Sequence, residues 1–198
     1  MQPHKRKNNM NNTSSPLKAF ERAKSLELSK WYMGTLMTSL AEAKDTNGAF
    51  LLVEGILAPG TEPPPHVHSR EDELFYVLEG EVDVYVGEQA FKVETGECIF
   101  LPRFKSHAFV IHSPRIHVLT LVTPAGLEEV FRSMTTPAQR LHIPTGELTY
   151  SKADLTVQRF REYGVRILAP EEVADQMPLY PKSLIPSTAS DLITDQRG

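Results

Sequence analysis

Short segments rich in apolar and β-favouring residues follow one another closely through the middle of the chain, and glycine or proline separates most of them. This spacing leaves no room for the crossover helices that parallel strands require. Short strands with such breaks are typical of an antiparallel sandwich or barrel, and we predict this fold. The sequence shows no internal repeat, so we expect one copy of it. The predicted strands cover residues 31–40, 50–57, 73–78, 81–86, 90–94, 98–101, 107–112 and 116–122.

After the last predicted strand the apolar spacing becomes helical. One helix is expected beyond Thr123, which can cap it, with Pro124 in the first turn. A second helix is expected over residues 151–163, where Ser151 can act as the cap and Gly164 can end the helix. The apolar residues that define the first helix are Leu127, Val130, Phe131 and Met134.

These patterns divide the chain into four parts. Residues 1–18 are rich in Asn, Ser, Pro and Lys and contain almost nothing to bury, which predicts a disordered arm. Residues 19–123 are expected to form the barrel, and residues 124–170 a helical extension packed on it. Residues 171–198 hold several prolines and few apolar clusters, so an irregular C-terminal tail is expected.

Composition and charge exclude several classes of protein. The net charge of -4 gives no sign of nucleic-acid binding, and we interpret the seven positive and two negative charges of the first thirty residues as a solvated arm. No secretory signal is recognisable, and no apolar stretch approaches the ~20 residues that span a bilayer. We predict a cytoplasmic protein without nucleic-acid or membrane partners. The single cysteine, Cys98, is expected to be a buried, inert thiol.

Two motifs place potential metal ligands along the predicted strands. His66 and His68 share a face if their segment is extended, which the three prolines before it favour. Glu73 begins the next strand, and His107 begins a later one. A lone His-x-His pair is more often incidental, but four such residues among regularly placed glycines and a proline favour a metal site over a purely structural interpretation. The motifs read Gly60-x5-His66-x-His68-x4-Glu73-x6-Gly80 and Gly96-x5-Pro102-x4-His107.

Three neutral imidazoles and one carboxylate suit one divalent transition metal, which could be Fe, Mn, Ni, Co, Cu or Zn. On an octahedral ion, two positions stay open for a substrate, as catalysis requires. Among the adjacent acidic residues we favour Glu73, because Asp72 would face the other way and Glu71 would alter the spacing to Gly80. The remaining histidines are expected to be ordinary surface or interface residues: His4, His112, His117 and His142.

Strand periodicity also predicts the surroundings of these ligands. If Glu73 points inward, Phe75 and Val77 line the same pocket. Phe109 and Ile111 share the face of His107 and are predicted to line it as well. The outward side chains of the Glu73 strand are large, so we expect a covering element or second subunit and predict a homodimer. These outward residues are Leu74, Tyr76 and Leu78.

The two motifs resemble those of the cupin superfamily. The stretch from Pro63 to Gly80 is similar to single-domain cupins of the quercetin 2,3-dioxygenase-like group, and so is the Thr123-Pro124-Ala125-Gly126-Leu127-Glu128-Glu129 segment with the helices after it. The resemblance covers residues 31–168. It implies an all-β fold, the double-stranded β-helix or jelly-roll barrel, with C-terminal helices.

The chain departs from the family pattern at two positions of the second motif. Phe104 stands where the family usually has a glycine, and Ile111 stands where it usually has an asparagine. A β-carbon resists the tight turn that glycine allows, so the local turn is expected to differ. Neither change removes a ligand. Phe104 and Ile111 are therefore expected to line the pocket and to make its mouth more apolar.

The resemblance implies a mononuclear metal-binding protein that acts as a metal-dependent dioxygenase on a small aromatic or enolic substrate. Glu73 would then be a ligand and also the catalytic general base, for which it must detach from the metal or be desolvated. Two alternatives stay open, because cupins host many unrelated activities. One is a non-oxidative isomerase or lyase with the metal as Lewis acid, and the other is a non-catalytic module that binds or senses a small ligand.

Overall fold

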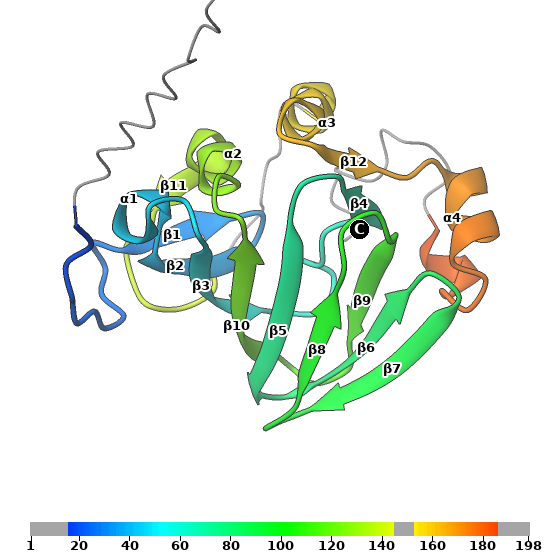
Figure 1. Ribbon diagram of the computed structural model, residues 1–198. Coiled ribbons are helices and arrows are strands. Elements are labelled where there is room, and N and C mark those ends of the chain that lie inside the picture. The colour runs from blue at the N-terminus through cyan, green and yellow to red at the C-terminus, as the bar shows by residue number, and fades with distance from the viewer. Residues whose placement is uncertain (1–15, 145–152, 186–198) are drawn as a thin grey trace, which may run out of the picture.

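The computed structural model describes residues 16–144 and 153–185, which form two antiparallel sheets that enclose a barrel (Figure 1). This arrangement confirms the predicted all-β jelly-roll barrel with C-terminal helices. The seven-stranded sheet contains, in order, β11 (Thr135–Pro137), β1 (Ser29–Tyr32), β2 (Thr35–Ala41), β3 (Leu51–Leu57), β10 (Ile116–Thr123), β5 (Asp72–Glu79) and β8 (Cys98–Leu101). The five-stranded sheet contains β12 (Val165–Ile167), β4 (His66–His68), β9 (His107–Ile111), β6 (Glu81–Val86) and β7 (Gln89–Glu94).

Side-chain alternation explains how the two sheets pack. In β3, buried residues alternate with half-buried ones, because successive side chains of a strand point to opposite faces. Inward residues of both sheets meet in one apolar core, and removing their surface from water is the main source of stability. This core includes Leu57, Val77, Val82, Val84, Phe109, Ile111 and Val118.

The segment predicted as one strand over residues 31–40 is a hairpin. β1 ends at Tyr32 and β2 begins at Thr35. The two turn residues, Met33 and Gly34, have φ values of 44° and 79°. Two left-handed residues in a two-residue turn match the right-handed twist of hairpin strands. The sequence did not indicate this turn, because methionine rarely adopts a positive φ.

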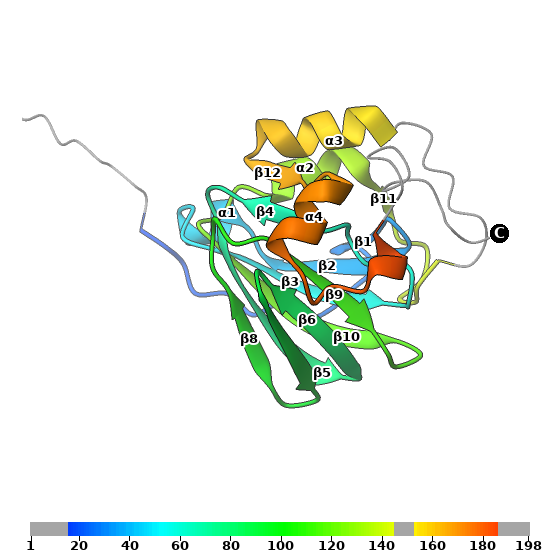
Figure 2. The same ribbon diagram turned by 90° about the vertical axis from the view of Figure 1, so that its right-hand side faces the viewer.

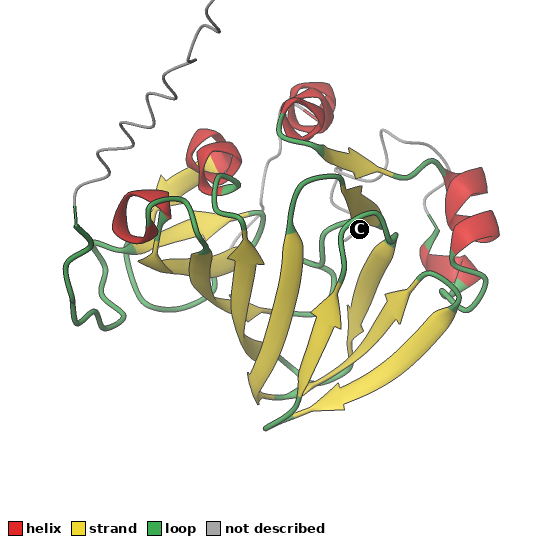
Figure 3. Ribbon diagram, viewed as in Figure 1, coloured by secondary structure: helices red, strands yellow, loops and turns green. Residues whose placement is uncertain are grey.

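Helices lie outside the strands (Figure 3). The two predicted helices correspond to α2 (Glu128–Met134) and α3 (Ala153–Glu162), which lie near the end of the barrel formed by β4 and β12 (Figure 2). The start predicted at Ser151 lies outside the described residues. Gly164 has a φ of 89°, in agreement with the predicted left-handed exit after α3. A further short helix, α1 (Ala43–Thr46), lies between β2 and β3.

The predicted irregular tail over residues 171–198 is wrong for its first part. Pro170–Gln176 forms α4, with proline in the first turn, and a 3-10 turn follows at Lys182–Leu184. Val173 and Met177 are buried in an apolar cluster with Tyr85 of β6. Two apolar residues are too few to indicate a helix from the sequence. The helix is stabilised because these residues pack against the sheet. Residues 186–198 lie outside the described residues.

The predicted disordered arm over residues 1–18 falls mostly outside the described residues. Residues 16–28 contain no helix or strand. Two ion pairs attach this segment to the barrel: Arg22 contacts Asp45, and Lys24 contacts Glu54. Across the described ranges, the structure has no helix long and apolar enough to traverse a lipid bilayer.

Cys98 is exposed, so the expectation of a buried thiol is wrong. In β8 the residues at Ile99 and Leu101 are buried, whereas Cys98 and Phe100 face outward. An apolar run indicated burial on both faces, but β8 is the last strand of its sheet and only one of its faces is covered.

Candidate metal centre

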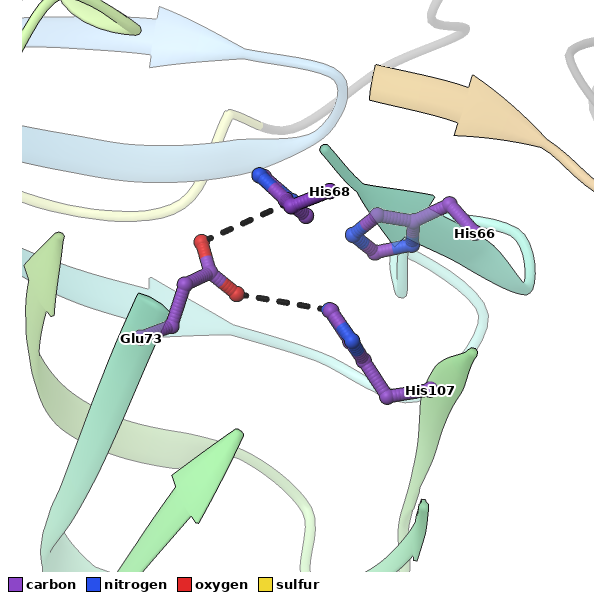
Figure 4. A group of neighbouring side chains, drawn as sticks. All are labelled: His66, His68, Glu73 and His107. Carbon is purple, nitrogen blue, oxygen red and sulfur yellow. Dashed lines mark ion pairs between the residues drawn. The ribbon is translucent and has the colours of Figure 1, made fainter. Parts of the chain in front are cut away.

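The four predicted ligands converge at one end of the barrel (Figure 4). His66 and His68 lie on β4, His107 on β9 and Glu73 on β5. The register places His66 opposite His107 in the five-stranded sheet, whereas Glu73 comes from the other sheet. The group therefore bridges the two sheets. Its members are only 2% to 7% exposed.

Interatomic distances show that the side chains point toward a common centre. Glu73 Oε1 lies 3.8 Å from His68 Nε2, and Glu73 Oε2 lies 3.4 Å from His107 Nε2 (dashed in Figure 4). One potential ligand atom from each of the four residues lies within 4.8 Å of the others. The carboxylate thus faces the imidazoles across a space the size of a single ion.

The other ring nitrogen of each histidine is held by an oxygen. Nδ1 of His66 donates to the Pro64 carbonyl at 2.8 Å, and Nδ1 of His107 donates to the Lys105 carbonyl at 3.2 Å. Nδ1 of His68 contacts the Glu71 carboxylate at 3.2 Å. Because these oxygens accept, each Nδ1 carries a proton, and in the neutral form of each ring Nε2 is left as a lone-pair donor. Such contacts orient histidines for metal binding.

The charges of the group favour an ionised carboxylate beside a neutral imidazole. Burial, together with the two other histidines, holds the pKa of His66 well below its usual range. Burial alone would raise the pKa of Glu73, but the surrounding imidazoles outweigh it and lower the pKa to about 2. Burial likewise lowers the pKa of His68, yet Glu73 and Glu71 outweigh it and the net pKa is raised. The negative charge of Glu73 is therefore available to a cation.

The geometry fits one metal ion. With metal–ligand bonds of about 2.1 Å, ligand atoms on opposite sides of an ion lie about 4.2 Å apart, close to the spread found here. Within the described residues, His107 Nε2 is buried without a hydrogen-bond partner, although buried polar atoms normally have one. A divalent ion would satisfy this nitrogen. The cluster is compatible with a single divalent ion, and the ligand types admit several metals.

The cluster borders an apolar cavity of about 160 Å³. Phe75 and Phe109 line it as predicted, with their rings edge to face and their centroids 5.5 Å apart. Val77 and Ile111 do not line it: both belong to the barrel core. The alternation of side chains along each strand correctly predicted that both point inward. It could not show how far along the barrel axis the cavity extends.

Phe104 does not line the cavity, so this part of the prediction is wrong. Its side chain is 69% exposed, and its φ is 64°, in the left-handed region. Its backbone N–H donates to the His68 carbonyl at 2.7 Å. The backbone here takes the tight turn that glycine would take, and the turn directs the ring to solvent.

Sequence reasoning missed several residues of the site. Glu71 was weighed only as a rival ligand, whereas it is buried and contacts His68 from behind. Its position three residues after a ligand is the only local signal that could have indicated this role. The helices add Phe131 and Phe160 to the cavity wall. No local pattern shows that these rings reach the barrel interior, because that depends on how the helices dock.

The histidines outside the pattern lie away from the cluster. His112 contacts Asp83 at 2.8 Å, and His117 contacts Glu54 at 2.7 Å. Neither lines the cavity. His4 lies outside the described residues.

The sequence is similar to one protein-family model and to one characterised protein. Residues 53–123 match the family model described as "Cupin domain". The chain is 24% identical over 131 residues to the quercetin 2,3-dioxygenase of Bacillus subtilis (strain 168). This match covers 66% of the chain but only 39% of the length of that relative. The residues matched by the family model, 53–123, contain both motifs.

Solved structures of similar fold cover about half of the chain or somewhat more. An RmlC-like cupin from Shewanella frigidimarina has a TM-score of 0.48 at 20% identity and covers 56% of this chain and 96% of its own. A predicted oxalate decarboxylase from Thermotoga maritima has the same TM-score and identity and covers 52% of this chain and 99% of its own. At these scores the likenesses carry no argument about activity.

Proposed function

Because residues 53–123 match the cupin family model, we propose that this protein is a metal-dependent dioxygenase that acts on a small aromatic or enolic compound. The observation that carries the proposal is the convergence of three imidazoles and one carboxylate beside an apolar cavity. The distant likeness to a quercetin 2,3-dioxygenase supports the same reaction class. The metal would supply Lewis acidity and, if redox-active, the capacity to react with dioxygen.

The cavity wall supports a substrate with little charge. Among the described residues that line it, Glu73 is the only acidic one, and no lysine or arginine lines it. A substrate with a carboxylate or phosphate away from the metal would bury that charge without a partner, which is costly. An enol or phenol has one weakly acidic oxygen that can approach the cation, and its hydrocarbon part suits the Phe75 and Phe109 rings.

Glu73 is proposed to take up the proton that the substrate hydroxyl loses. One carboxylate oxygen would receive the proton, and the other would remain available to a bound cation. A metal-bound carboxylate is a weak base, so partial release and an apolar environment are needed. Phe75, which is the next inward residue on β5, provides apolar surface beside the Glu73 carboxylate. The chain's contribution to the chemistry is therefore orientation, exclusion of water and movement of this proton.

Anaerobic loading with each of Fe, Mn, Co, Ni, Cu and Zn, followed by oxygen-electrode measurements on a panel of catechols, enediols and a flavonol, tests the proposal. We expect one O2 consumed per substrate molecule and both atoms of ¹⁸O2 in the product. Glu73→Gln should lower the rate by roughly 10²-fold or more while it keeps the shape of the side chain.

Absence of oxygen uptake with every metal across the panel would contradict the dioxygenase proposal. Tightly held zinc without oxygen uptake would instead favour a non-oxidative isomerase or lyase. Substrate binding without turnover would favour a binding module.

The ligand assignment is tested separately by metal content. Replacing His66, His68 or His107 by alanine should each reduce the metal bound per chain to roughly one tenth or less under limiting metal. The matched control is His112→Ala, since the His112 ring is exposed and contacts Asp83 rather than the cluster. Unchanged metal content in all three variants would show that the assignment is wrong.

A further inference from the structure

Among the residues that the structure describes, one polar side chain of the cavity wall makes no side-chain hydrogen bond that would stabilise the fold. Thr120 lies on β10 between Val118 and Val122, shares their inward face and lines the cavity. In the described parts of the chain its hydroxyl has no hydrogen-bond partner. The other threonines of the wall do have one: Thr35 donates to the Tyr32 carbonyl at 2.6 Å, and Thr61 donates to the Ala58 carbonyl at 2.8 Å.

Packing alone would favour valine at this position. Valine has the same shape as threonine and suits a strand equally well, whereas an unpaired hydroxyl beside apolar surface is unfavourable. The two neighbours on the same face are valines, Val118 and Val122. The hydroxyl of Thr120 is therefore best explained by a partner that enters the cavity.

The sheet register fixes where this hydroxyl lies relative to the metal cluster. Thr120 is paired with Phe75, and Val122 is paired with Glu73. Thr120 is thus one strand across from β5 and two residues along from Glu73. With strands about 4.8 Å apart and a rise of about 3.3 Å per residue, the two Cα positions are about 8 Å apart. A molecule with one ring can span this separation.

Size and charge define the rest of the ligand. The cavity of about 160 Å³ is similar to an engineered cavity of about 150 Å³ that binds benzene. A divalent ion with the Glu73 carboxylate leaves one positive charge, which a single anionic oxygen of the ligand would cancel. Any further oxygen must then be neutral, since no lysine or arginine among the described residues lines the cavity.

We propose that Thr120 is a substrate-positioning residue that binds a neutral oxygen at the far end of a one-ring substrate. The substrate class is a monoanionic phenol or enol that approaches the metal by its acidic oxygen and carries a distal hydroxyl or carbonyl group. This inference rests on the proposed function for the near end of the substrate, and adds the distal group and the limit of one ring.

The test uses protein loaded with Zn²⁺, which is redox-inert, and two probes that differ by one hydroxyl: 4-methylcatechol and 4-(hydroxymethyl)catechol. Calorimetric titration without oxygen should show that wild type binds the hydroxymethyl compound roughly three- to tenfold more tightly, the effect of one neutral hydrogen bond. Thr120→Val should abolish this preference, and Thr120→Ser should retain it. In the metal-free state Thr120→Val should be at least as resistant to urea as wild type.

Thr61→Val is the matched control, because its hydroxyl lines the same cavity but is already bonded to Ala58. It should destabilise the protein and leave the preference unchanged. The inference is overturned if wild type shows no preference, if Thr120→Val keeps it, or if Thr120→Val is clearly less stable, which would indicate a structural partner. Any of these results leaves the oxygen-uptake test of the proposed function standing on its own.

Discussion

Each histidine of the cluster has its Nδ1 held by an oxygen, but the three oxygens differ in kind. His66 and His107 contact backbone carbonyls, whereas His68 contacts the carboxylate of Glu71. Only this last contact is charged, and Glu71 itself is only 5% exposed. A buried carboxylate behind an imidazole raises the basicity of the nitrogen that faces the metal. We therefore expect Glu71 to increase metal affinity although it does not reach the ion.

Glu71→Gln should weaken Zn²⁺ or Co²⁺ affinity by about tenfold, because the amide still accepts from Nδ1 but carries no charge. Competition with a chelator of known affinity measures this. Glu79→Gln is the control: Glu79 is exposed and pairs with Arg115, so its loss should leave the affinity unchanged. Equal affinities of Glu71→Gln and wild type would remove the role assigned to Glu71.

The loop between β8 and β9 positions the ligand His107. Asp72 accepts two hydrogen bonds from the Arg103 side chain, at 3.1 and 2.6 Å, and one from its backbone N–H at 2.8 Å. The next residue, Phe104, donates its N–H to His68. The loop is thereby attached to both strands that carry the other ligands. This attachment holds Phe104 in its left-handed conformation.

Phe104→Gly should raise the free energy of unfolding by about 0.5 to 1 kcal/mol, because glycine adopts a positive φ without the Cβ clash and the exposed ring contributes little packing. Urea unfolding of the metal-free protein measures the change. A loss of stability would contradict this prediction. It would mean that the packing of the ring and the extra freedom of glycine in the unfolded state outweigh the strain of the positive φ.

The basic side chains of residues 16–28 pair with two carboxylates of the barrel, Asp45 and Glu54. The positive charges favour the ionised form of both carboxylates. The hydrogen bond from Arg22 lowers the pKa of Asp45 below its usual 3.8. Burial would raise the pKa of Glu54, but Lys24 and His117 outweigh it and lower the pKa below its usual 4.5. A carboxyl group with a lowered folded-state pKa stabilises the fold above its unfolded pKa. This stabilisation is lost as the pH falls through the folded value.

The double variant Asp45→Asn/Glu54→Gln should be about 1 kcal/mol less stable than wild type at pH 7, the order expected for two partly exposed ion pairs. The difference should shrink as the pH falls below about 4, toward the lowered pKa values at which the folded wild type protonates the same groups. Urea midpoints between pH 7 and pH 3 follow this. A difference that stays constant over the range would show that charge does not attach the segment.

At the scale of the whole molecule, the outer face of the seven-stranded sheet stays apolar at its β5–β8 end. Tyr76 is 39% exposed, Leu78 37% and Phe100 56%. β8 is the last strand of that sheet in the described residues, so it presents backbone groups without a neighbouring strand. Exposed apolar surface next to an open edge favours association. The homodimer predicted from the sequence stays a prediction, and this face is where we place it.

Light scattering at tens of micromolar should give a mass of twice 22.2 kDa. Phe100→Glu should shift the protein toward the monomer, because a charge would be buried in the contact. Phe104→Glu is a suitable control, since Phe104 is also exposed but lies in the loop after β8. A wild-type protein that is monomeric throughout this range would contradict the prediction.

Local periodicity determined a large part of this protein. The period of two in β5 correctly gave the inward direction of Glu73, Phe75 and Val77, and the spacing of the two motifs gave the four residues that converge. Gly164 marked the end of α3. These features depend on neighbours within a few residues, which the sequence displays directly.

Only the tertiary structure decided which surfaces meet. Glu71 became a support for His68, α4 became a cover for Tyr85, and Phe104 was directed to solvent by contacts with segments distant in sequence. The cavity wall combines Thr120 of the sheet with Phe160 of a helix 40 residues later in the chain. Such proximity is set by how sheets and helices dock, because packing energy depends on shapes that no local pattern specifies.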